Sequence, residues 1–190
     1  MLSQSEILEI LSDSGALLKG HFELRSGLHS ADFFQCANLL RYPRLAQKLC
    51  EDLARRIPAN IIDDVTTVVS PALGGILVGH EIARALDKLS LFAEKQDGTL
   101  VLRRFDISPK DKVLVAEDVV TRGGRVQETI DLVRAAGGTV VAAATLVDRS
   151  GGQAKFDVPH YSLLHMSPVT WAPSDCPLCK QGGKAVHPGS

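Results

Sequence analysis

Two acidic residues stand just before a glycine-containing turn near the middle of the chain. Glu117 and Asp118 follow the apolar run of residues 113–116, and after two valines comes Thr-Arg-Gly-Gly-Arg at residues 121–125. Such a turn offers backbone N–H groups, a threonine hydroxyl and the start of the next helix, all of which bind anions. Its two glycines let the backbone approach a ligand closely. The pattern therefore predicts a phosphate site.

The carboxylates beside this predicted phosphate site say more about the ligand. Glu117 and Asp118 would repel a free phosphate, but carboxylates accept hydrogen bonds from hydroxyl groups and suit a bound magnesium ion. A ribose 5-phosphate unit carries both a phosphate and a cis-diol. A sugar phosphate therefore explains the combination of acids and glycine turn better than phosphate alone does.

Other phosphate and metal motifs are missing from the sequence. There is no G-x-G-x-x-G after a predicted strand and no G-x-x-x-x-G-K-[ST], so neither a dinucleotide fingerprint nor a Walker A loop is present. His80 and Glu81 begin like the zinc motif H-E-x-x-H, but position 84 is Arg84. His80 is therefore interpreted as a residue of a helix surface.

Alternating helices and strands must position these residues. Short apolar runs predict the strands, and helical periodicity predicts the helices between them. They are, in chain order, the helix 43–57, the strand 67–70, the helix 76–86, the strands 91–93 and 113–116, the helix 126–136 and the strand 139–147. This order predicts parallel pairing with right-handed crossovers. Ligands then bind beyond the carboxyl ends of the strands, at residues 70–75, 117–127 and 148–152.

The two ends of the chain and one connector have weaker patterns. Ser3 and Glu6 match a capping box at the start of a first helix. Residues 20–38 are turn-rich, and the Asp-Gly pair at residues 97–98 is typical of a hairpin. Residues 174–190 are rich in Gly, Pro and Lys, which predicts an irregular tail.

Composition limits the class of protein. The chain has 190 residues, 45% of them hydrophobic, which suffices for one α/β domain with a small added subdomain. A net charge of -1 excludes a basic field over the whole sequence for binding nucleic acid. No apolar run is long enough to cross a membrane, and the first residues show no signal-peptide pattern. We therefore expect a cytoplasmic protein without nucleic-acid or membrane partners.

Four cysteines occur in the chain, namely Cys36, Cys50, Cys176 and Cys179. Reduced thiols are the expectation for such a protein. Cys176 and Cys179 have the spacing of a zinc knuckle, but a closed zinc site needs four ligands, and no second pair lies nearby in the sequence. We therefore interpret the segment as a reduced tail, with a metal site shared between subunits or a redox role as the alternatives.

Residues 113–129 resemble the phosphoribosyl pyrophosphate binding motif of the type I phosphoribosyltransferases. That motif has four apolar residues, two acidic residues, two apolar residues and a turn containing Thr and Gly. The resemblance implies the α/β fold of that family, with a central, mainly parallel sheet flanked by helices and a small N-terminal hood. It implies a single domain over residues 1–190, with the hood mainly in residues 1–42 plus parts of the C-terminal tail, and the core in about residues 43–165.

The same resemblance implies roles for individual residues. Glu117 and Asp118 would hold the ribose hydroxyls, and the turn would cradle the 5-phosphate. Residues 70–75 resemble the pyrophosphate loop of one branch of the family. The residues implied to bind phosphoribosyl pyrophosphate are Ala72, Leu73, Gly74, Glu117, Asp118, Val119, Val120, Thr121, Arg122, Gly123, Gly124 and Arg125.

Two arginines depart from the family pattern. Arg122 and Arg125 stand where the family turn commonly has small or hydroxyl residues. A guanidinium fully engaged with the phosphate would strengthen binding by about 1.5–3 kcal/mol. One that points to solvent would contribute little, and the sequence leaves both interpretations open.

A further resemblance concerns the base that accepts the sugar. Residues 22–34 resemble the hood segment of the orotate phosphoribosyltransferases, and residues 176–190 are similar to the tail of the same branch. Orotate is a planar carboxylate, which suits the fork geometry of an arginine. The residues implied to contact orotate are Arg25, Phe33, Phe34, Thr121 and Arg149. For Phe33 and Phe34, packing in the protein core is the alternative role.

The resemblance also implies a reaction. Orotate N1 attacks C1 of the sugar with inversion, pyrophosphate leaves, and orotidine 5-phosphate forms for de novo pyrimidine (UMP) synthesis. Magnesium, held mainly by the substrate and by no direct protein ligand, would neutralise the leaving group. Asp118 and Lys95 are the implied catalytic residues. Lys95 would act from a basic loop that is shared across a homodimer.

Lys95 and the overall activity both have alternatives. The chain has no histidine between His80 and His160, and it has Gly74 where many relatives have lysine. A solvated surface hairpin is therefore the alternative for Lys95. For the whole chain, the alternatives are a phosphoribosyltransferase for a purine base and a non-catalytic sensor of phosphoribosyl pyrophosphate. The sequence has no helix-turn-helix extension, which speaks against a transcriptional sensor.

Overall fold

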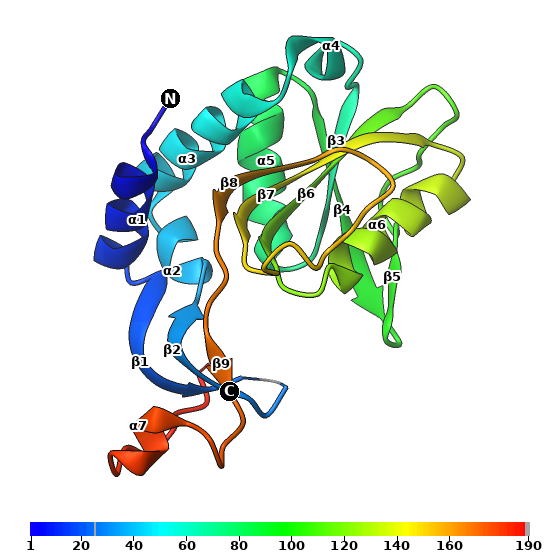
Figure 1. The fold of residues 1–190 in the computed structure, drawn as a ribbon. Helices are drawn as coiled ribbons and strands as arrows, with labels where there is room; N and C mark the ends of the chain where they lie inside the picture. Colours follow the sequence, from blue (N-terminus) through cyan, green and yellow to red (C-terminus); the bar gives the residue numbers. More distant parts are fainter. Residues whose placement is uncertain (25, 189–190) are drawn as a thin grey trace.

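The computed structural model describes residues 1–24 and 26–188, and a six-stranded sheet forms its centre (Figure 1). The strands are β3 (Thr67–Pro71), β4 (Leu89–Gln96), β5 (Thr99–Val101), β6 (Lys112–Val120), β7 (Thr139–Asp148) and β8 (His160–His165). Their order across the sheet is β5-β4-β3-β6-β7-β8. All neighbours pair in parallel except β5, which runs antiparallel to β4 at one edge. The predicted mainly parallel α/β sheet is confirmed.

Helices cover both faces of this sheet because residues along β6 alternate between two cores. The helices are α1 (Gln4–Asp13), α2 (Ala37–Leu40), α3 (Pro43–Arg56), α4 (Ala59–Ile62), α5 (Gly74–Leu86), α6 (Gly124–Ala135) and α7 (Pro177–Lys180). Leu114 and Ala116 belong to the core under α3 and α5, whereas Val113 and Val115 belong to the core under α6. Successive strand residues point to opposite faces, so the molecule has three layers (Figure 1).

The order of the strands along the chain changes direction across the sheet between β3 and β6, which makes this position the topological switch point. From β3 it passes through α5 to β4 on one side, and it later returns to β6 on the other side of β3. Ligands of open parallel sheets bind beyond the carboxyl ends of strands that flank such a switch point. At these ends lie residues 72–74 and the pair Glu117 and Asp118. The topology therefore brings two of the predicted binding loops together.

A second, antiparallel sheet lies beside the main one, toward the lower left in Figure 1. Its strands are β1 (Leu17–Glu23), β2 (His29–Phe34) and β9 (Thr170–Trp171), in the order β1-β2-β9. We call these strands, α7 and the segment 181–188 the hood. An isolated bridge between Phe22 and Val186 joins the tail to β1. The predicted boundaries of hood and core stay a prediction.

The turn-rich interpretation of residues 20–38 is wrong, because much of this segment forms the β1–β2 hairpin. The register shifts between Lys19 and Phe22, where β1 has one more residue than its partner. Such a bulge breaks the alternation of two by which strands are recognised in a sequence. The tail is also less irregular than predicted, because it contains α7 and the bridge at Val186.

Element boundaries near the sheet edge differ from the predicted ones by a few residues. Helices α5 and α6 begin two residues early, at Gly74 and Gly124. Strand β6 continues to Val120, so Glu117 and Asp118 lie within it rather than after it. Glycine disfavours helices, and for this reason periodicity assigned the helix starts to the first apolar residue instead.

Other predictions are confirmed by the structure. Ser3 and Glu6 form both hydrogen bonds of a capping box. Asp97 and Gly98 form the turn between β4 and β5, with φ of 49° and 89°, as a two-residue hairpin requires. Within the described ranges, no helix combines the length and the apolar character that crossing a bilayer demands.

Candidate active site

The carboxyl end of β6 carries the two acidic residues in a largely buried setting. Glu117 is only 6% exposed, and Asp118 is half-buried. The backbone N–H of Asp118 donates to Glu117 Oε1 at 3.0 Å, and the N–H of Val119 donates to Asp118 Oδ1 at 2.8 Å. These bonds use one oxygen of each carboxylate, so each side chain keeps a second oxygen for other donors.

The start of α5 approaches these carboxylates so closely that a side chain there would displace them. A Cβ atom at Gly74 would lie 2.6 Å from Asp118 Oδ2, and one at Gly75 would lie 2.9 Å from Glu117 Oε1. Both separations are far below ordinary contact distances. Gly74 therefore allows the close packing of α5 against Asp118. The peptide bond just before it, between Ala72 and Leu73, is cis.

Burial raises the pKa of both carboxyl groups. The pKa of Glu117 rises to about 9, first because of burial and then because of the neighbouring Asp118 charge. Burial also raises the pKa of Asp118. Two such groups in contact do not both ionise easily. A ligand that donates hydrogen bonds or brings positive charge would therefore stabilise the ionised pair.

The turn after β6 leaves a small open space beside the backbone. This cavity measures about 40 Å³, and its lining consists of Val119, Val120, Thr121, Gly123, Gly124, Arg125 and Val126. A single buried water needs about 10–15 Å³, so the turn leaves room for a small polar group. The turn is thus not closed off by its own side chains.

Gly123 and Gly124 contribute to this turn in different ways. Gly123 has a φ of 83°, and a Cβ there would lie 3.1 Å from Phe156. A Cβ at Gly124 would meet no atom within 4 Å. Gly123 is therefore needed for the turn conformation, whereas Gly124 leaves space that a ligand can use. Phe156 and Ala154, which close the far side of Gly123, carried no signal in the sequence.

The two unusual arginines of the turn have different surroundings. Arg125 Nη1 donates to Glu128 Oε2 at 3.1 Å within α6. Arg122 is exposed, and it forms no ion pair with the residues that the structure describes. Arg125 is therefore paired within its own helix, while Arg122 is exposed and does not line the cavity.

Arg149 lies next to the end of β6 although it follows β7. Its backbone N–H donates to the carbonyl of Val120 at 2.9 Å. Burial lowers the pKa of its guanidinium, which makes no ion pair with any described side chain. The charge of Asp32 acts on it, but a half-buried cation with no carboxylate in direct contact is costly, so an anionic ligand would stabilise it.

Cys36 also belongs to this region, which the sequence did not indicate. Burial raises the pKa of its thiol strongly, the charges of Asp118 and Glu117 raise it further, and Arg149 opposes them. Cys36 immediately precedes α2. The segment between the hood and the core thus meets the ends of β6 and β7 at one place.

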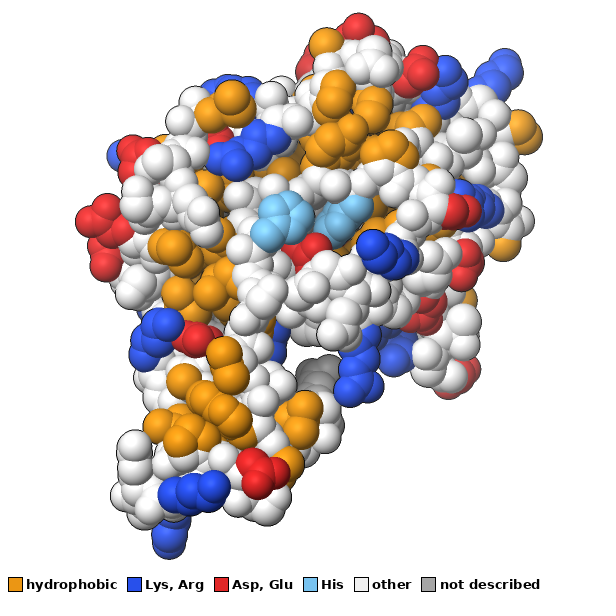
Figure 2. Space-filling model, in the orientation of Figure 1, with side chains coloured by type: hydrophobic (Ala, Val, Ile, Leu, Met, Phe, Trp, Pro, Cys, Tyr) orange, Lys and Arg blue, Asp and Glu red, His pale blue; other side chains and the backbone are white. Residues whose placement is uncertain are grey.

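Of the residues predicted to contact orotate from the hood, the structure describes Phe33 and Phe34. Phe34 is 5% exposed and packs in the core under α3 and α5, so only its backbone remains for a ligand. The ring of Phe33 contacts Phe22 with centroids 5.7 Å apart. Arg25 lies outside the described residues. In Figure 2, a notch separates the hood from the main body, and basic side chains line its edge.

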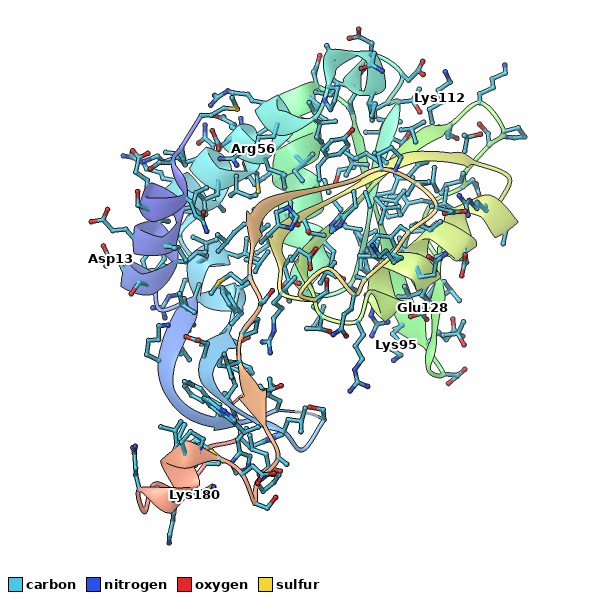
Figure 3. All side chains as sticks on the ribbon, in the orientation of Figure 1. Asp13, Arg56, Lys95, Lys112, Glu128 and Lys180 are labelled. Atoms are coloured by element: carbon cyan, nitrogen blue, oxygen red, sulfur yellow. The ribbon has the colours of Figure 1, made fainter. Side chains whose placement is uncertain are left out.

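Lys95 is not part of this cluster within the single chain. It is an exposed residue of β4 and pairs with Leu100 of β5 (Figure 3). Nearby, Glu94 pairs with Arg104 at 3.2 Å. Lys95 thus lies on a regular hairpin, and its predicted catalytic role stays a prediction.

Another hollow of the described surface lies away from the strand ends. It has a volume of about 390 Å³ and lies between α3 and α5. Arg84 on its wall is already paired with Glu51 and Glu81, each at 2.9 Å. This hollow offers satisfied charges and no strand ends, so we assign the site to the switch point instead.

Comparison with known proteins agrees with this assignment. Residues 39–180 match the phosphoribosyl transferase domain family. A relative from Desulforamulus reducens named orotate phosphoribosyltransferase is 49% identical over 190 residues, covering 100% of this chain and 98% of its own. The chain therefore belongs to the phosphoribosyltransferase family and, within it, to the orotate phosphoribosyltransferases.

Solved structures give the same fold. Orotate phosphoribosyltransferase from Aeropyrum pernix is 25% identical with a TM-score of 0.69, over 84% of this chain and 93% of that one. Adenine phosphoribosyltransferase from Rhodothermus marinus is 23% identical with a TM-score of 0.65, over 85% and 99%. The second match shows the fold alone, so the fold does not decide which base is used.

Proposed function

We infer that this chain transfers the phosphoribosyl group of 5-phosphoribosyl 1-pyrophosphate to orotate. The products are orotidine 5-phosphate and pyrophosphate, a step of de novo UMP synthesis. One observation carries the inference: the acidic pair at the end of β6 lies beside an open glycine turn. The similarity over the full chain to orotate phosphoribosyltransferases supports it.

The sugar phosphate uses the end of β6 and the turn that follows. Carboxylate oxygens of Glu117 and Asp118 accept hydrogen bonds from the ribose hydroxyls, and the backbone N–H groups of residues 121–125 bind the 5-phosphate at the start of α6. Residues 72–74 face the pyrophosphate. The contact between Gly74 and Asp118 supports this arrangement, because it joins the pyrophosphate loop to the diol site.

Arg149 favours orotate over a purine base. Orotate carries a carboxylate that a guanidinium binds in a bidentate manner, and Arg149 is half-buried and forms no direct ion pair with a described carboxylate. Adenine has no negative charge to stabilise such a cation. The backbone of Phe33 and Phe34, the side chain of Thr121 and Arg25 complete the proposed base site.

Magnesium fits this site as an ion carried by the pyrophosphate. The hard oxygen donors of Glu117 and Asp118 suit it, but each already accepts a backbone N–H, so substrate oxygens and water would supply most ligands. When bound, magnesium neutralises the charge of the leaving pyrophosphate. The protein itself contributes positioning of the sugar and exclusion of water.

The proposal includes a homodimer in which one subunit supplies Lys95 to the site of the other. The exposed position of Lys95 on β4, outside its own cluster, supports a role in trans. A cation there would stabilise charge on the departing pyrophosphate. The cytoplasmic location predicted from the sequence stays a prediction.

A substrate panel tests the proposed function. Purified protein with phosphoribosyl pyrophosphate and magnesium is given orotate, adenine, hypoxanthine or xanthine, and the nucleotide and pyrophosphate formed are measured. We expect orotidine 5-phosphate from orotate and no nucleotide from the purines. Turnover of a purine instead would favour the purine enzyme, and binding of phosphoribosyl pyrophosphate without turnover of any base would favour a sensor.

A further inference from the structure

Two histidines and two cysteines of the hood converge on one point. His21 lies on β1, His29 on β2, and Cys176 and Cys179 lie at the start of α7. One nitrogen or sulfur atom from each side chain lies within 4.8 Å of the other three. None of these residues belongs to the proposed phosphoribosyl or orotate site.

The β1–β2 hairpin places the two histidines on one face. Glu23 of β1 pairs with His29 of β2, and residues directly opposite each other point to the same side of a sheet. His21 lies at the bulge of β1, and its ring meets that of His29, with centroids 4.9 Å apart. Its Nε2 lies 2.9 Å from His29 Nδ1.

The tail brings the two thiols onto this face. The N–H of Val186 donates to the carbonyl of His21 at 2.8 Å, which holds the tail along β1. Cys176 Sγ then lies 3.4 Å from His21 Nε2. Cys179 Sγ lies 3.6 Å from His21 Nε2 and 3.3 Å from His29 Nδ1. Cys176 is completely buried and His29 is 7% exposed, so solvent has little access.

Hydrogen bonds alone do not account for this arrangement. A ring nitrogen of histidine has either one hydrogen or one lone pair in its plane, so it makes one good hydrogen bond. His21 Nε2 nevertheless has three close neighbours, namely His29 Nδ1, Cys176 Sγ and Cys179 Sγ. Cys179 Sγ also lies close to His29 Nδ1. Several atoms with lone pairs directed at one centre are the arrangement that a shared cation produces.

Three of the six separations between the ligand atoms fall in the range of a tetrahedral zinc ion, and all six lie within 4.8 Å. Bond lengths of about 2.0–2.1 Å to nitrogen and about 2.3 Å to sulfur give ligand-to-ligand edges of roughly 3.3–3.8 Å. The nitrogen–sulfur separations of 3.3, 3.4 and 3.6 Å fall in this range. The nitrogen–nitrogen separation of 2.9 Å is slightly shorter. Two thiolates and two neutral imidazoles would also balance the charge of Zn²⁺.

We propose that His21, His29, Cys176 and Cys179 bind one zinc ion that fastens the C-terminal tail to the hood. Four protein ligands leave no open position, so the ion is structural rather than catalytic. The sequence-based interpretation of Cys176 and Cys179 as a reduced tail assumed that no second ligand pair was near. The pair exists, but it comes from strands about 150 residues earlier in the chain.

Metal analysis of the full-length protein tests this proposal independently of any turnover. After dialysis against metal-free buffer, we expect about one zinc per chain in the wild type. Cys176→Ser and Cys179→Ser should each lose it, while Cys50→Ala, which changes a buried core cysteine, should retain it. Absence of zinc together with a Cys176–Cys179 disulfide would overturn the proposal, and so would zinc retained by both serine variants.

Two measurements on the wild type remain decisive if the serine variants fail to fold. Replacement of zinc by Co²⁺ should give the visible absorption of a tetrahedral site and a thiolate-to-cobalt band in the near ultraviolet. Removal of the metal with a chelator should lower Tm by more than about 5 °C, because binding to the folded state is part of the folding free energy. An octahedral cobalt spectrum or an unchanged Tm would contradict a structural zinc site.

Discussion

The two glycines of the phosphate turn have different roles: Gly123 sets the conformation of the turn, and Gly124 is proposed to leave space for the ligand. Gly123 has a positive φ and lies against Phe156, so the protein itself leaves no room for a side chain at this position. Gly124 faces open space and begins α6. If the 5-phosphate occupies that space, only the ligand excludes a side chain at position 124.

Replacing Gly124 by alanine should therefore affect binding but not folding. We expect a Tm equal to or slightly above that of the wild type, because alanine favours helices over glycine. The affinity for phosphoribosyl pyrophosphate should fall by about 1–3 kcal/mol, the usual cost of forcing a methyl group into filled space. Thermal melting and equilibrium titration measure the two effects. An unchanged affinity would mean that the phosphate does not approach this residue.

The raised pKa of Glu117 makes the stability of the ligand-free protein depend on pH. The group keeps its proton in the folded state up to about pH 9, whereas the unfolded chain releases it near its ordinary value of about 4.5. The folded state thus binds more protons between these values, so stability from this group falls as pH rises through that window.

The variant Glu117→Gln should lose this dependence. We expect the free energy of unfolding of the wild type to fall relative to that of Glu117→Gln as pH rises from about 4.5 to about 9. Above that window the difference should be constant. Urea titrations of both proteins at several pH values, without ligand, measure it. A difference that is independent of pH would show that the carboxyl is already ionised in the free protein.

At the scale of elements, helix α5 holds the site together by packing very close to β3 and β6. Gly75 and Gly79 face these strands, and a Cβ at Gly79 would lie 2.6 Å from Ser70 Oγ. This close approach brings the start of α5, with Gly74, against Asp118. Ser70 itself is buried on β3.

Gly79→Ala should therefore push α5 away from the sheet. We expect a loss of stability of about 1–3 kcal/mol, as for other overpacked cores. Leu77→Ala is the control on the same helix, since Leu77 is 50% exposed and should change stability little. The double variant Ser70→Gly with Gly79→Ala removes the clashing side chain and should recover part of the loss. Equal stabilities of wild type and Gly79→Ala in urea would rule out tight packing here.

The sequence predicted the central elements because their signals are local. Ser3 and Glu6 cap α1, Asp97 and Gly98 form the hairpin turn, and the apolar runs became parallel strands. The phosphate turn was recognisable because its residues are contiguous. Lengths and ends were less predictable, since β6 continues through two charged residues whose burial depends on α5.

Features made by distant residues were not predictable in the same way. The bulge before Phe22 hid strand β1, and the approach of Gly74 to Asp118 follows from packing between two elements. The cluster of His21 and Cys176 depends on how the tail returns to β1. No pattern within a short window of the sequence contains that information.

At the scale of the whole molecule, the proposed site is incomplete in one chain. The acidic pair, the turn and Arg149 gather at the switch point, whereas Lys95 lies on the exposed β4–β5 hairpin. A closed dimer would bring the hairpin of one subunit to the site of the other. Activity would then depend on residues from both chains.

Mixed dimers test this sharing. Lys95→Ala and Asp118→Asn should each be inactive or nearly so as homodimers. When the two are refolded together, half of the dimers are mixed, and each mixed dimer has one site with both native residues. We therefore expect about a quarter of the wild-type activity in the mixture. No recovery in mixtures whose mixed dimers are verified by mass would place Lys95 outside the partner's site.

The central claim is that the acids at the end of β6 hold the sugar of phosphoribosyl pyrophosphate. Its most direct test is the dissociation constant of phosphoribosyl pyrophosphate with magnesium, measured by calorimetry for the wild type and Asp118→Asn. Asp131→Asn, an exposed change on α6, is the matched control. Loss of a charge-assisted hydrogen bond costs about 1.5–3 kcal/mol, so we predict a constant raised roughly 10- to 150-fold for Asp118→Asn and unchanged for Asp131→Asn. Equal constants for all three proteins would contradict the account.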